Sequence, residues 1–547
     1  MTTGSPTPEL DPGTALRFAV LTDAAVPPHW HTQCLQSLAA QGEICVALLR
    51  VAAPSARRGR TGVLYDPARR SVALADADPG ACTGPVYDVE AGEVAARLAE
   101  HDLGFVLDLR ERHQDITFQV PAHGVWRFSF PTPPARMAAR ALLDGDLTIT
   151  AALIRTAADG ERQSLVDGKY GVVSASVART TDRVLRGAAD FPSRAARAVR
   201  LRLPHPAAAR DRGQVSPATA TLGFLWRARL AVTLVSRRCA KALRDAVTET
   251  YWSIGVVKAP VESVMDGSVR GDHFHWHPGT RPDTYIADPI PLPGGPGVVY
   301  AEEFDHMTRH GRLIATTYSE TEGWSGSEVV AQETFHMSYP YLFEHHGETL
   351  CVPETGWNNA VSVYRLKDPP RLEKDRDILT GVAAGDPTVF WWDGRWWMFY
   401  TDCFEPRDTD LYIWYAATPW GPWRPHLRNP VKSDVTSSRP AGAPFVRDGK
   451  LLRPAQDDAG RYGWRMVVNE VVRLSPSEFA EVEVTRIGPF GSGPYPVGPH
   501  TLSVAGPHVY VDGKRSVVAL SLKARRLLRR LRARYAGRRD DSASKGH

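Results

Sequence analysis

Residues 385–402 read GDPTVFWWDGRWWMFYTD, an Asp-Pro pair followed by two apolar runs on either side of a DG turn. Two runs of this kind joined by a DG turn predict a β-hairpin. Asp386 precedes the loop glycine, Gly394, by eight residues. The same spacing recurs elsewhere in the chain, so this hairpin is one unit of a repeat.

The repeat has five units, each with a first position eight residues before a loop. These first positions are Asp288, Tyr339, Asp386, Ala441 and Gly498, and all except Ala441 are followed by proline. The loops near 296, 347, 394, 449 and 506 are separated by 51, 47, 55 and 57 residues. Periods of about 50 residues are typical of propeller blades, because one blade cannot bury both faces of its sheet alone. We predict a five-bladed β-propeller over residues 281–516. A β-sandwich or an irregular β-domain, in which x-Pro is a common turn, is the alternative.

The N-terminal part of the chain has a different pattern. Residues 1–14 are expected to be a disordered lead-in. Over residues 15–180, short apolar strands at 16–21, 44–49 and 103–109 alternate with helical patterns, which predicts an α/β domain with an open, mostly parallel sheet. The first strand runs into LTDAAVPPHW rather than a GxGxxG turn, so a dinucleotide-dependent dehydrogenase is disfavoured.

Two further segments are predicted to be helical. Residues 181–280 are rich in Arg and Ala and are expected to form a helical connector. Residues 517–547 are expected to hold a basic amphipathic helix and a tail, because apolar residues recur at helical spacing among nine basic residues at 523–539. Such a helix can lie on an anionic membrane surface and bring a lipid or lipid-linked acceptor within reach. A solvated helix or one that docks a partner is the alternative.

Length and composition bound the remaining possibilities. A chain of 547 residues predicts two to four domains. The formal charge is +5, and subtracting the nine basic residues of 523–539 leaves about −4, so no nucleic-acid-binding surface is expected. The six cysteines form no CxxC pair, and no signal peptide or long uncharged apolar run is visible. We expect a cytoplasmic protein, with the C-terminal helix as a candidate contact with the inner membrane face.

The repeat also predicts where a functional site would lie. The first strand of each propeller blade lines the central channel, so equivalent positions face a common pocket. A second set of positions lies seven residues after each loop: Glu303, Glu354, Thr401, Gln456 and Gly513, with Glu302, Asp402 and Asp457 beside them. Carboxylates that converge in a partly dry cleft shift one another's pKa values, which is what glycosidic bond chemistry requires. An Asp-Pro turn, and acids that hold backbone amides between blades, are the structural alternatives.

Other candidate residues lie in blades two, four and five. Arg439 offers a planar fork of donors that suits a phosphate or carboxylate, although it could equally pair with an acid of a neighbouring blade. Gln456 and Asp457 lie nearby in the RPAQD run, and Tyr339 is expected beside them as a substrate-binding residue. His500 could face the channel as a base, as a metal ligand or as a structural residue. The sequence does not assign a metal ion to this site; a divalent cation is one candidate.

The order of five motifs resembles a known family: ADP at 287–289, SYP with PET at 338–355, GDP with FYTD at 385–402, SRPAG with RPAQD at 438–457 and GPHTL at 498–502. It resembles the N-terminal domain of plant glucosamine inositolphosphorylceramide transferases and of their bacterial relatives. That domain is similar to the five-bladed propellers of arabinanases, β-xylosidases and invertases. The resemblance covers roughly 240 residues.

The resemblance implies roles for individual residues. Asp288 matches the first-blade base or nucleophile of those hydrolases, Asp386 the third-blade Asp that steadies the transition state, and His500 the fifth-blade His near a central ion. Glu303 and Glu354 would modulate them. Where the hydrolases carry a general-acid Glu, this chain has Arg439, which fits a leaving group that is already phosphate.

We therefore predict a carbohydrate-active enzyme, a glycosyltransferase that moves a sugar from a phosphate- or nucleotide-activated donor to a lipid or small-molecule acceptor. Apart from the activated sugar donor and the candidate divalent cation, the sequence predicts no cofactor. A glycoside hydrolase of the arabinanase or invertase type and a non-catalytic glycan- or lipid-binding scaffold are the alternatives.

The first domain resembles the methionyl-tRNA formyltransferase fold through its strands at 16–21 and 105–109 and the run HGVWRFSF at 123–130. Where formyltransferases carry an Asn and a His in this segment, the chain has Arg127 and Ser129. The resemblance therefore implies that folate-dependent formyl transfer is lost and that the domain binds a ligand or docks a partner. N-formyl or acyl transfer by this domain, with the motif misaligned by a few residues, is the remaining alternative.

Overall fold

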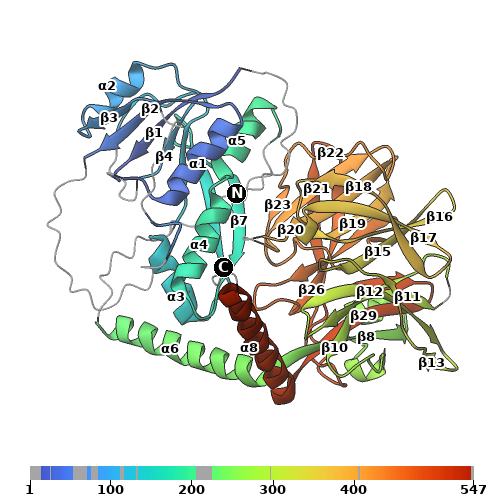
Figure 1. Ribbon diagram of the computed structural model, residues 1–547. Coiled ribbons are helices and arrows are strands. Elements are labelled where there is room, and N and C mark those ends of the chain that lie inside the picture. Colours follow the sequence, from blue (N-terminus) through green and yellow to red (C-terminus); the bar gives the residue numbers. More distant parts are fainter. Residues whose placement is uncertain are drawn as a thin grey trace.

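The computed structural model describes residues 14–24, 26–52, 71–75, 84–110, 116–130, 133–204, 224–295, 297–404 and 407–543, without the side chains of 224, 530 and 533–543. Figure 1 shows an α/β unit beside a β-propeller, with the long helix α6 (Phe224–Val247) running along one edge of the α/β unit towards the propeller. No helix among the described residues is long and apolar enough to cross a bilayer.

The α/β unit contains one seven-stranded sheet in the order β3-β2-β1-β4-β5-β6-β7. Strands β1 to β5 pair in parallel, and β6 and β7 complete the sheet in antiparallel pairing. Its strands are β1 Arg17–Thr22, β2 Ile44–Val51, β3 Val86–Val89, β4 Phe105–Asp108, β5 Val125–Phe128, β6 Thr148–Thr156 and β7 Arg162–Gly171. Its helices are α1 His29–Ala40, α2 Val94–Ala99, α3 Pro134–Asp144, α4 Val177–Ala188 and α5 Phe191–Arg200. The predicted parallel sheet with helices is confirmed, and the likeness to formyltransferases stays a prediction.

The propeller has five sheets, which confirms the predicted five blades. Blade one holds β10 Thr284–Pro291, β11 Val298–Asp305, β12 His310–Ser319, β13 Gly323–Trp324 and β14 Glu328–Ala331, and blade two holds β15 Ser338–His345, β16 Glu348–Glu354, β17 Ala360–Lys367 and β18 Arg371–Thr380. Blade three holds β19 Ala384–Trp392, β20 Arg395–Asp402, β21 Asp410–Ala416, β22 Arg424–Pro425 and β23 Lys432–Ser433. Blade four holds β24 Phe445–Arg447, β25 Lys450–Asp457, β26 Arg465–Leu474 and β27 Phe479–Ile487.

The fifth blade joins strands from two distant parts of the chain. Its sheet runs β28 (Leu502–Ala505), β29 (His508–Val518), β8 (Thr248–Lys258) and β9 (His275–Trp276), with the short helix α7 (Val261–Met265) between β8 and β9. β8 pairs with β29 over its whole length, and Ile254 and Val256 pack against Ile286 of blade one. The N-terminal strand therefore closes the ring. The expectation of a helical connector over 181–280 is corrected here, because the propeller already begins at Thr248.

The repeat in the sequence corresponds to a backbone feature. In each blade the pairing of the two inner strands is interrupted, and the first position of the repeat is the residue directly after the last pair before the interruption. These last pairs are 287 with 302, 338 with 354, 385 with 401, 440 with 455 and 497 with 514. Asp288, Tyr339, Asp386 and Gly498 have positive φ angles, and in blade four the positive φ falls on Gly442. The x-Pro motif thus marks a bulge, which turns the following side chains relative to the ladder.

The α/β unit contacts the propeller beside the segment that leads to Arg439. Val435 N–H donates to the carbonyl of Lys169 on β7 at 3.0 Å. Arg194 of α5 donates to the Ser433 hydroxyl at 2.9 Å, and Arg197 donates to the Asn429 carbonyl at 2.5 Å. The two units therefore meet next to the channel residues described below.

Candidate active site

Buried acids from several blades converge in the propeller channel. Asp288 on β10 is 5% exposed. Its Oδ2 accepts from the Tyr339 N–H of blade two at 3.2 Å, and its Oδ1 accepts from the Thr501 hydroxyl of blade five at 2.9 Å. Asp288 is therefore fixed between its two neighbouring blades.

His500 and Asp512 stand beside Asp288. His500 Nδ1 lies 2.5 Å from Asp512 Oδ2, and its Nε2 lies 3.7 Å from Asp288 Oδ1. The imidazole also stacks on the ring of Trp252 from β8 at 4.0 Å. Burial opposes protonation of His500, but the neighbouring Asp512 and Asp288 raise its pKa overall.

The same three residues could hold a metal ion. One ligand atom from each of Asp288, His500 and Asp512 lies within 4.8 Å of the others, and all three side chains are buried. Two carboxylate oxygens and an imidazole nitrogen form a donor set that suits a divalent cation. A bound cation there would compete with protonation of His500 and would hold Asp288 ionised.

Arg439 is the centre of a second cluster. Its Nε lies 2.6 Å from Asp386 Oδ2, its Nη1 lies 2.6 Å from Asp408 Oδ1, and its Nη2 lies 3.0 Å from Glu354 Oε2. Gln456 Nε2 also donates to Asp386 Oδ2 at 2.6 Å. Three acids therefore fix the guanidinium, and its pKa is raised well above the usual value despite the opposing effect of burial.

Several channel acids hold protons more tightly than free acids do. Burial raises the pKa of Asp288 to about 6, although His500 opposes this shift. Burial and Glu354 raise the pKa of Asp386 to about 7 against the opposing charge of Arg439, and burial with Asp408 raises that of Asp458 to about 7. Burial raises the pKa of Glu302 well above its usual value. Near neutral pH the channel therefore holds both protonated and ionised carboxyl groups, the combination that acid–base chemistry needs.

The structure separates the predicted residues into two groups. Asp288, Glu354, Asp386, Arg439, Gln456 and His500 meet in the channel through the contacts above. Glu303 points to the opposite face of β11, where Arg312 Nε donates to it at 2.7 Å, because neighbouring residues on a strand alternate in direction. Asp457 pairs instead with Arg465 and Arg486, each at 2.6 Å. These two residues are corrected: neither lies in the channel cluster.

Tyr339 lies in the channel but is committed to structural contacts. Its side chain is completely buried. Its hydroxyl lies 2.9 Å from the Thr388 hydroxyl and accepts from the Gly442 N–H at 2.9 Å. Tyr339 therefore ties blades two, three and four together, and the expectation that it binds substrate is corrected.

Five channel residues were not among the predicted site residues: Glu302, Asp408, Asp458, Tyr462 and Asp512. Glu302 and Asp512 were within reach of the sequence, because each stands one residue before a repeat position. A choice of strand face decides between Glu302 and Glu303, and the repeat spacing does not fix that choice. The other three lie on loops between strands, where the repeat has no fixed spacing.

Exposed aromatic rings follow the second strands of blades two, three and four. Trp357 follows β16, Phe404 follows β20 and Tyr462 follows β25, and each is more than two-fifths exposed. The rings of Trp357 and Phe404 lie 6.4 Å apart, and the Arg439 guanidinium lies 5.5 Å from the centre of the Tyr462 ring. We call these three residues the aromatic rim, because they lie at the strand ends that carry Glu354 and the Asp386–Arg439 cluster.

The comparisons with known proteins match this half of the chain. Residues 278–488 match the family "Glucosamine inositolphosphorylceramide transferase 1, N-terminal". Glucosamine inositolphosphorylceramide transferase 1 of Oryza sativa subsp. japonica is 27% identical over 285 residues, which are 48% of this chain and 38% of that protein. The Arabidopsis thaliana protein of the same name is 29% identical over 210 residues, 37% of this chain and 28% of that protein. The chain thus spans about a third of the length of these relatives, which are named as transferases.

Solved structures similar to the chain include glycoside hydrolases. An exo-β-1,3-galactanase from Clostridium thermocellum has 12% identity and a TM-score of 0.31, over 38% of this chain and 52% of that chain. A family 117 glycoside hydrolase from Zobellia galactanivorans has 13% identity and a TM-score of 0.31, over 50% of this chain and 92% of that chain.

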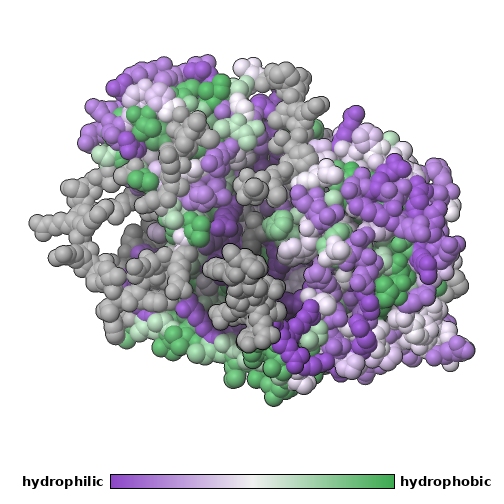
Figure 2. Space-filling view, viewed as in Figure 1, coloured by the Kyte–Doolittle hydropathy of each residue, from purple (hydrophilic) through white to green (hydrophobic). Residues whose placement is uncertain are grey.

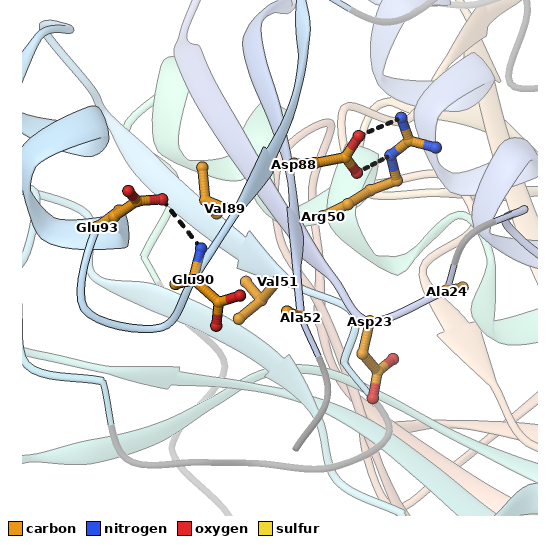
Figure 3. A pocket seen from close by; sticks show the side chains of 9 residues that line it. All are labelled: Asp23, Ala24, Arg50, Val51, Ala52, Asp88, Val89, Glu90 and Glu93. Atoms are coloured by element: carbon orange, nitrogen blue, oxygen red, sulfur yellow. Dashed lines mark hydrogen bonds and ion pairs between the residues drawn. The ribbon is translucent and has the colours of Figure 1, made fainter. Parts of the chain in front are cut away.

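The α/β unit has a cleft of its own, whose lining residues are shown in Figure 3. This cleft of about 310 Å³ lies at the carboxyl ends of β1, β2 and β3, and Asp23, Asp88 and Glu90 are among its lining residues. The lining includes neither Arg127 nor Ser129. Arg127 Nε instead donates to the buried Asp108 at 2.7 Å, so the segment expected to carry formyltransferase chemistry has an ion pair at this position.

Proposed function

We propose that the propeller channel transfers a sugar from a phosphate- or nucleotide-activated donor to a lipid or small-molecule acceptor. The observation that carries this proposal is the buried carboxylate cluster, built within a domain that matches a family named for a transferase. By the resemblance to hydrolase propellers, Arg439 stands where those enzymes carry a general acid. An activated donor needs no such acid, because its phosphate leaving group departs without a proton.

Asp288 is the group best placed to act on the acceptor. With a pKa of about 6 it is mostly ionised at neutral pH, and its contacts with Tyr339 and Thr501 hold it in one orientation. As a base it would take the proton of the acceptor hydroxyl while the acceptor oxygen bonds to the anomeric carbon. The bond from that carbon to the phosphate oxygen would break, and the phosphate would keep the electron pair. As a nucleophile, Asp288 would instead bond to the anomeric carbon as the phosphate leaves with its electron pair. The acceptor oxygen would then displace Asp288 from that carbon and give its proton to the released carboxylate.

Arg439 and Asp386 would assist this step, each in a different way. Because three acids already fix Arg439, the proposed role of this residue changes from a free clamp on the leaving group to a positioning residue that orients Asp386 and Glu354. Asp386, when ionised, would stabilise positive charge that develops on the sugar ring. The aromatic rim would contact the apolar face of the sugar at the channel mouth.

Nucleotide release from a panel of nucleotide sugars, measured by mass spectrometry with a mixture of lipid and soluble acceptors, tests the proposal. Asp288→Asn should lower the rate at least about 100-fold, because it removes the base or nucleophile. Glu303→Gln is the matched control: it changes an acid of the same blade outside the channel and should leave the rate within about twofold. Full activity of Asp288→Asn would refute catalysis in the channel.

Hydrolysis is the second candidate, and Glu302 favours it. The pKa of this buried acid is raised well above its usual value, and its Oε1 has no hydrogen-bond partner among the described residues. A protonated acid in the channel could supply the proton that an unactivated glycoside needs. Release of reducing sugar from oligosaccharides, lost in Glu302→Gln and retained in Glu303→Gln, would favour hydrolysis over transfer. Sugar binding without either activity would indicate a scaffold.

A further inference from the structure

Helix α6 carries a stripe of apolar side chains that nothing in the described molecule covers. Leu225, Val232, Val235 and Leu243 are each between 59 and 82% exposed. Their spacing of 7, 3 and 8 residues places them along one side of the helix. Cys239, also exposed, falls on the same side. Soluble helices normally turn such a stripe towards a core.

The opposite side of α6 is fixed to the α/β unit. Leu230 and Leu234 are buried in the core of that unit. Arg237 and Arg238 donate to backbone carbonyls of residues 174 and 175 at 3.2 and 3.0 Å. The exposed stripe therefore cannot turn inward without breaking this packing.

Helix α8 (Leu520–Ala543) shows the same arrangement. Leu520, Leu527, Leu528 and Leu531 are each between 52 and 59% exposed, at the i, i+3, i+4 spacing of one helix face. Leu522, on the other side, is buried. The predicted amphipathic helix is thus present, with its apolar face turned outward.

Basic side chains hold the other face of α8 against the propeller. Arg526 Nε donates to the His306 carbonyl at 2.7 Å, and Arg529 donates to the Met307 carbonyl at 2.9 Å. Lys523 pairs with Glu249 at 2.6 Å. The helix therefore docks through its polar side, the reverse of the usual packing of an amphipathic helix on a protein.

The two helices meet at one edge of the molecule. Ala519 N–H, just before α8, donates to the carbonyl of Val247 at the end of α6 at 2.9 Å. Lys523 Nζ donates to the carbonyl of Asp245 at 2.7 Å. Figure 2 shows hydrophobic surface along the lower edge of the molecule, over α6 and the place where it joins α8.

The charge of this edge indicates what covers it. Helix α6 has six basic residues and one acid, and α8 has nine basic residues and two acids. Glu249 and Asp283 offset part of this charge through ion pairs with α8. Lys241 of α6 pairs with Asp245 of the same helix, and the other contacts of the described basic side chains are mostly with neutral carbonyls, so a positive excess stays at the edge. A second copy of the chain would bring equal positive charge to it, which repels, whereas an anionic lipid surface attracts it.

We propose that α6 and α8 together form a two-helix platform that binds the surface of a bilayer containing anionic lipid. Apolar side chains on both helices enter the boundary between head groups and acyl chains, and the neighbouring basic side chains meet the lipid phosphates. This goes beyond binding through the C-terminal helix alone, because α6 contributes an equal share. It does not depend on the chemistry of the channel.

Vesicle flotation of the full-length protein tests the platform, with vesicles of phosphatidylcholine alone or with the anionic lipid phosphatidylglycerol added. We expect binding to the anionic vesicles, weakened by high salt because screening shortens the reach of the charges. Val232→Gln/Leu243→Gln on α6 and Leu527→Gln/Leu531→Gln on α8 should each lower the partition coefficient about tenfold or more. All four positions are exposed, so folding should be unaffected.

The matched control is Val482→Gln/Val484→Gln on β27, where two equally exposed valines lie outside the platform. It should bind vesicles as the unchanged protein does. Unaltered binding of the α6 variant would overturn the two-helix platform in favour of a tail anchor. Absence of binding to anionic vesicles, or an apolar edge found to join two copies by light scattering, would overturn membrane binding altogether.

Discussion

At the scale of single residues, Arg439 balances the charge of the channel. Its guanidinium meets Asp386, Asp408 and Glu354, each within 3.0 Å. Removal of one partner from a buried ionic cluster leaves unpaired charge and costs about 3–5 kcal/mol. We therefore expect Arg439→Met to lower the free energy of unfolding by that amount, measured by chemical denaturation.

A second substitution separates this charge effect from simple loss of packing. Asp386→Asn removes one of the acids that Arg439→Met leaves unpaired, so the double variant should be more stable than Arg439→Met alone. Strictly additive losses in the two single variants and the double variant would show that the cluster is not held by charge balance.

The aromatic rim gives a prediction about substrate binding. If Trp357 stacks on the sugar, Trp357→Ala should raise KM by about tenfold with little change in kcat, because the contact is the same in substrate and transition state. Trp391→Ala is the matched control. Trp391 is also more than half exposed, but it adjoins the β19–β20 turn at the opposite end of the sheet. Equal effects of the two substitutions on KM would contradict a specific role of the rim.

How far the site could be predicted also depends on single residues. Asp288 and Asp386 were predictable because x-Pro with a positive φ marks the same bulge in successive blades. The repeat spacing predicted Glu303, whereas Glu302 is the residue in the channel, because a shift of one residue moves a side chain to the other face of a strand. Asp408 comes from a loop, and loops carry no periodic signal that could assign its partner.

At the scale of elements, the bulges need particular backbone conformations. Gly442 has a φ of +114°, and a Cβ there would lie 1.9 Å from the carbonyl oxygen of Leu502 in the next blade. Gly442→Ala should therefore lower the melting temperature markedly, with a cost above the roughly 1–3 kcal/mol of backbone strain alone.

Gly449→Ala is the control for that prediction. Gly449 also has a positive φ, of +74°, but a Cβ there would meet nothing within 4 Å. Its substitution should cost only about 1–2 kcal/mol, since it places an L-residue in the left-handed region without a clash. Similar melting temperatures for the two variants would contradict a close approach of blades four and five at Gly442.

The closure of the propeller ring is the part of the fold that could not be predicted from the sequence. β8 carries the β-type run TYWSIGVV, yet it lies about 250 residues from its partner β29 and has no x-Pro motif. The repeat therefore predicts five loops correctly but assigns the last blade too few strands. Only tertiary pairing shows that Thr248–Lys258 belongs to the propeller rather than to the connector.

At the scale of the whole molecule, the α/β unit is coupled to the propeller through partly buried acids at their contact. Asp410 of β21 lies beside Ser433, which also accepts a hydrogen bond from Arg194 of α5. Burial and the neighbouring Asp190 raise the pKa of Asp410 to about 7, although Arg194 opposes this shift. The folded protein therefore favours the protonated form of Asp410 more than the unfolded chain does.

The sign of the pH effect follows from this difference. Between about pH 4 and pH 7, unfolding releases the proton of Asp410, so its contribution to stability is complete at low pH and is lost as the pH rises towards 7. Asp410→Asn cannot ionise and should escape that loss. Its melting temperature relative to the unchanged protein should rise from pH 4 to pH 7.5, by about 2 °C or more. A pH-independent difference between Asp410→Asn and the unchanged protein would mean that this acid is already ionised at the contact between the two units.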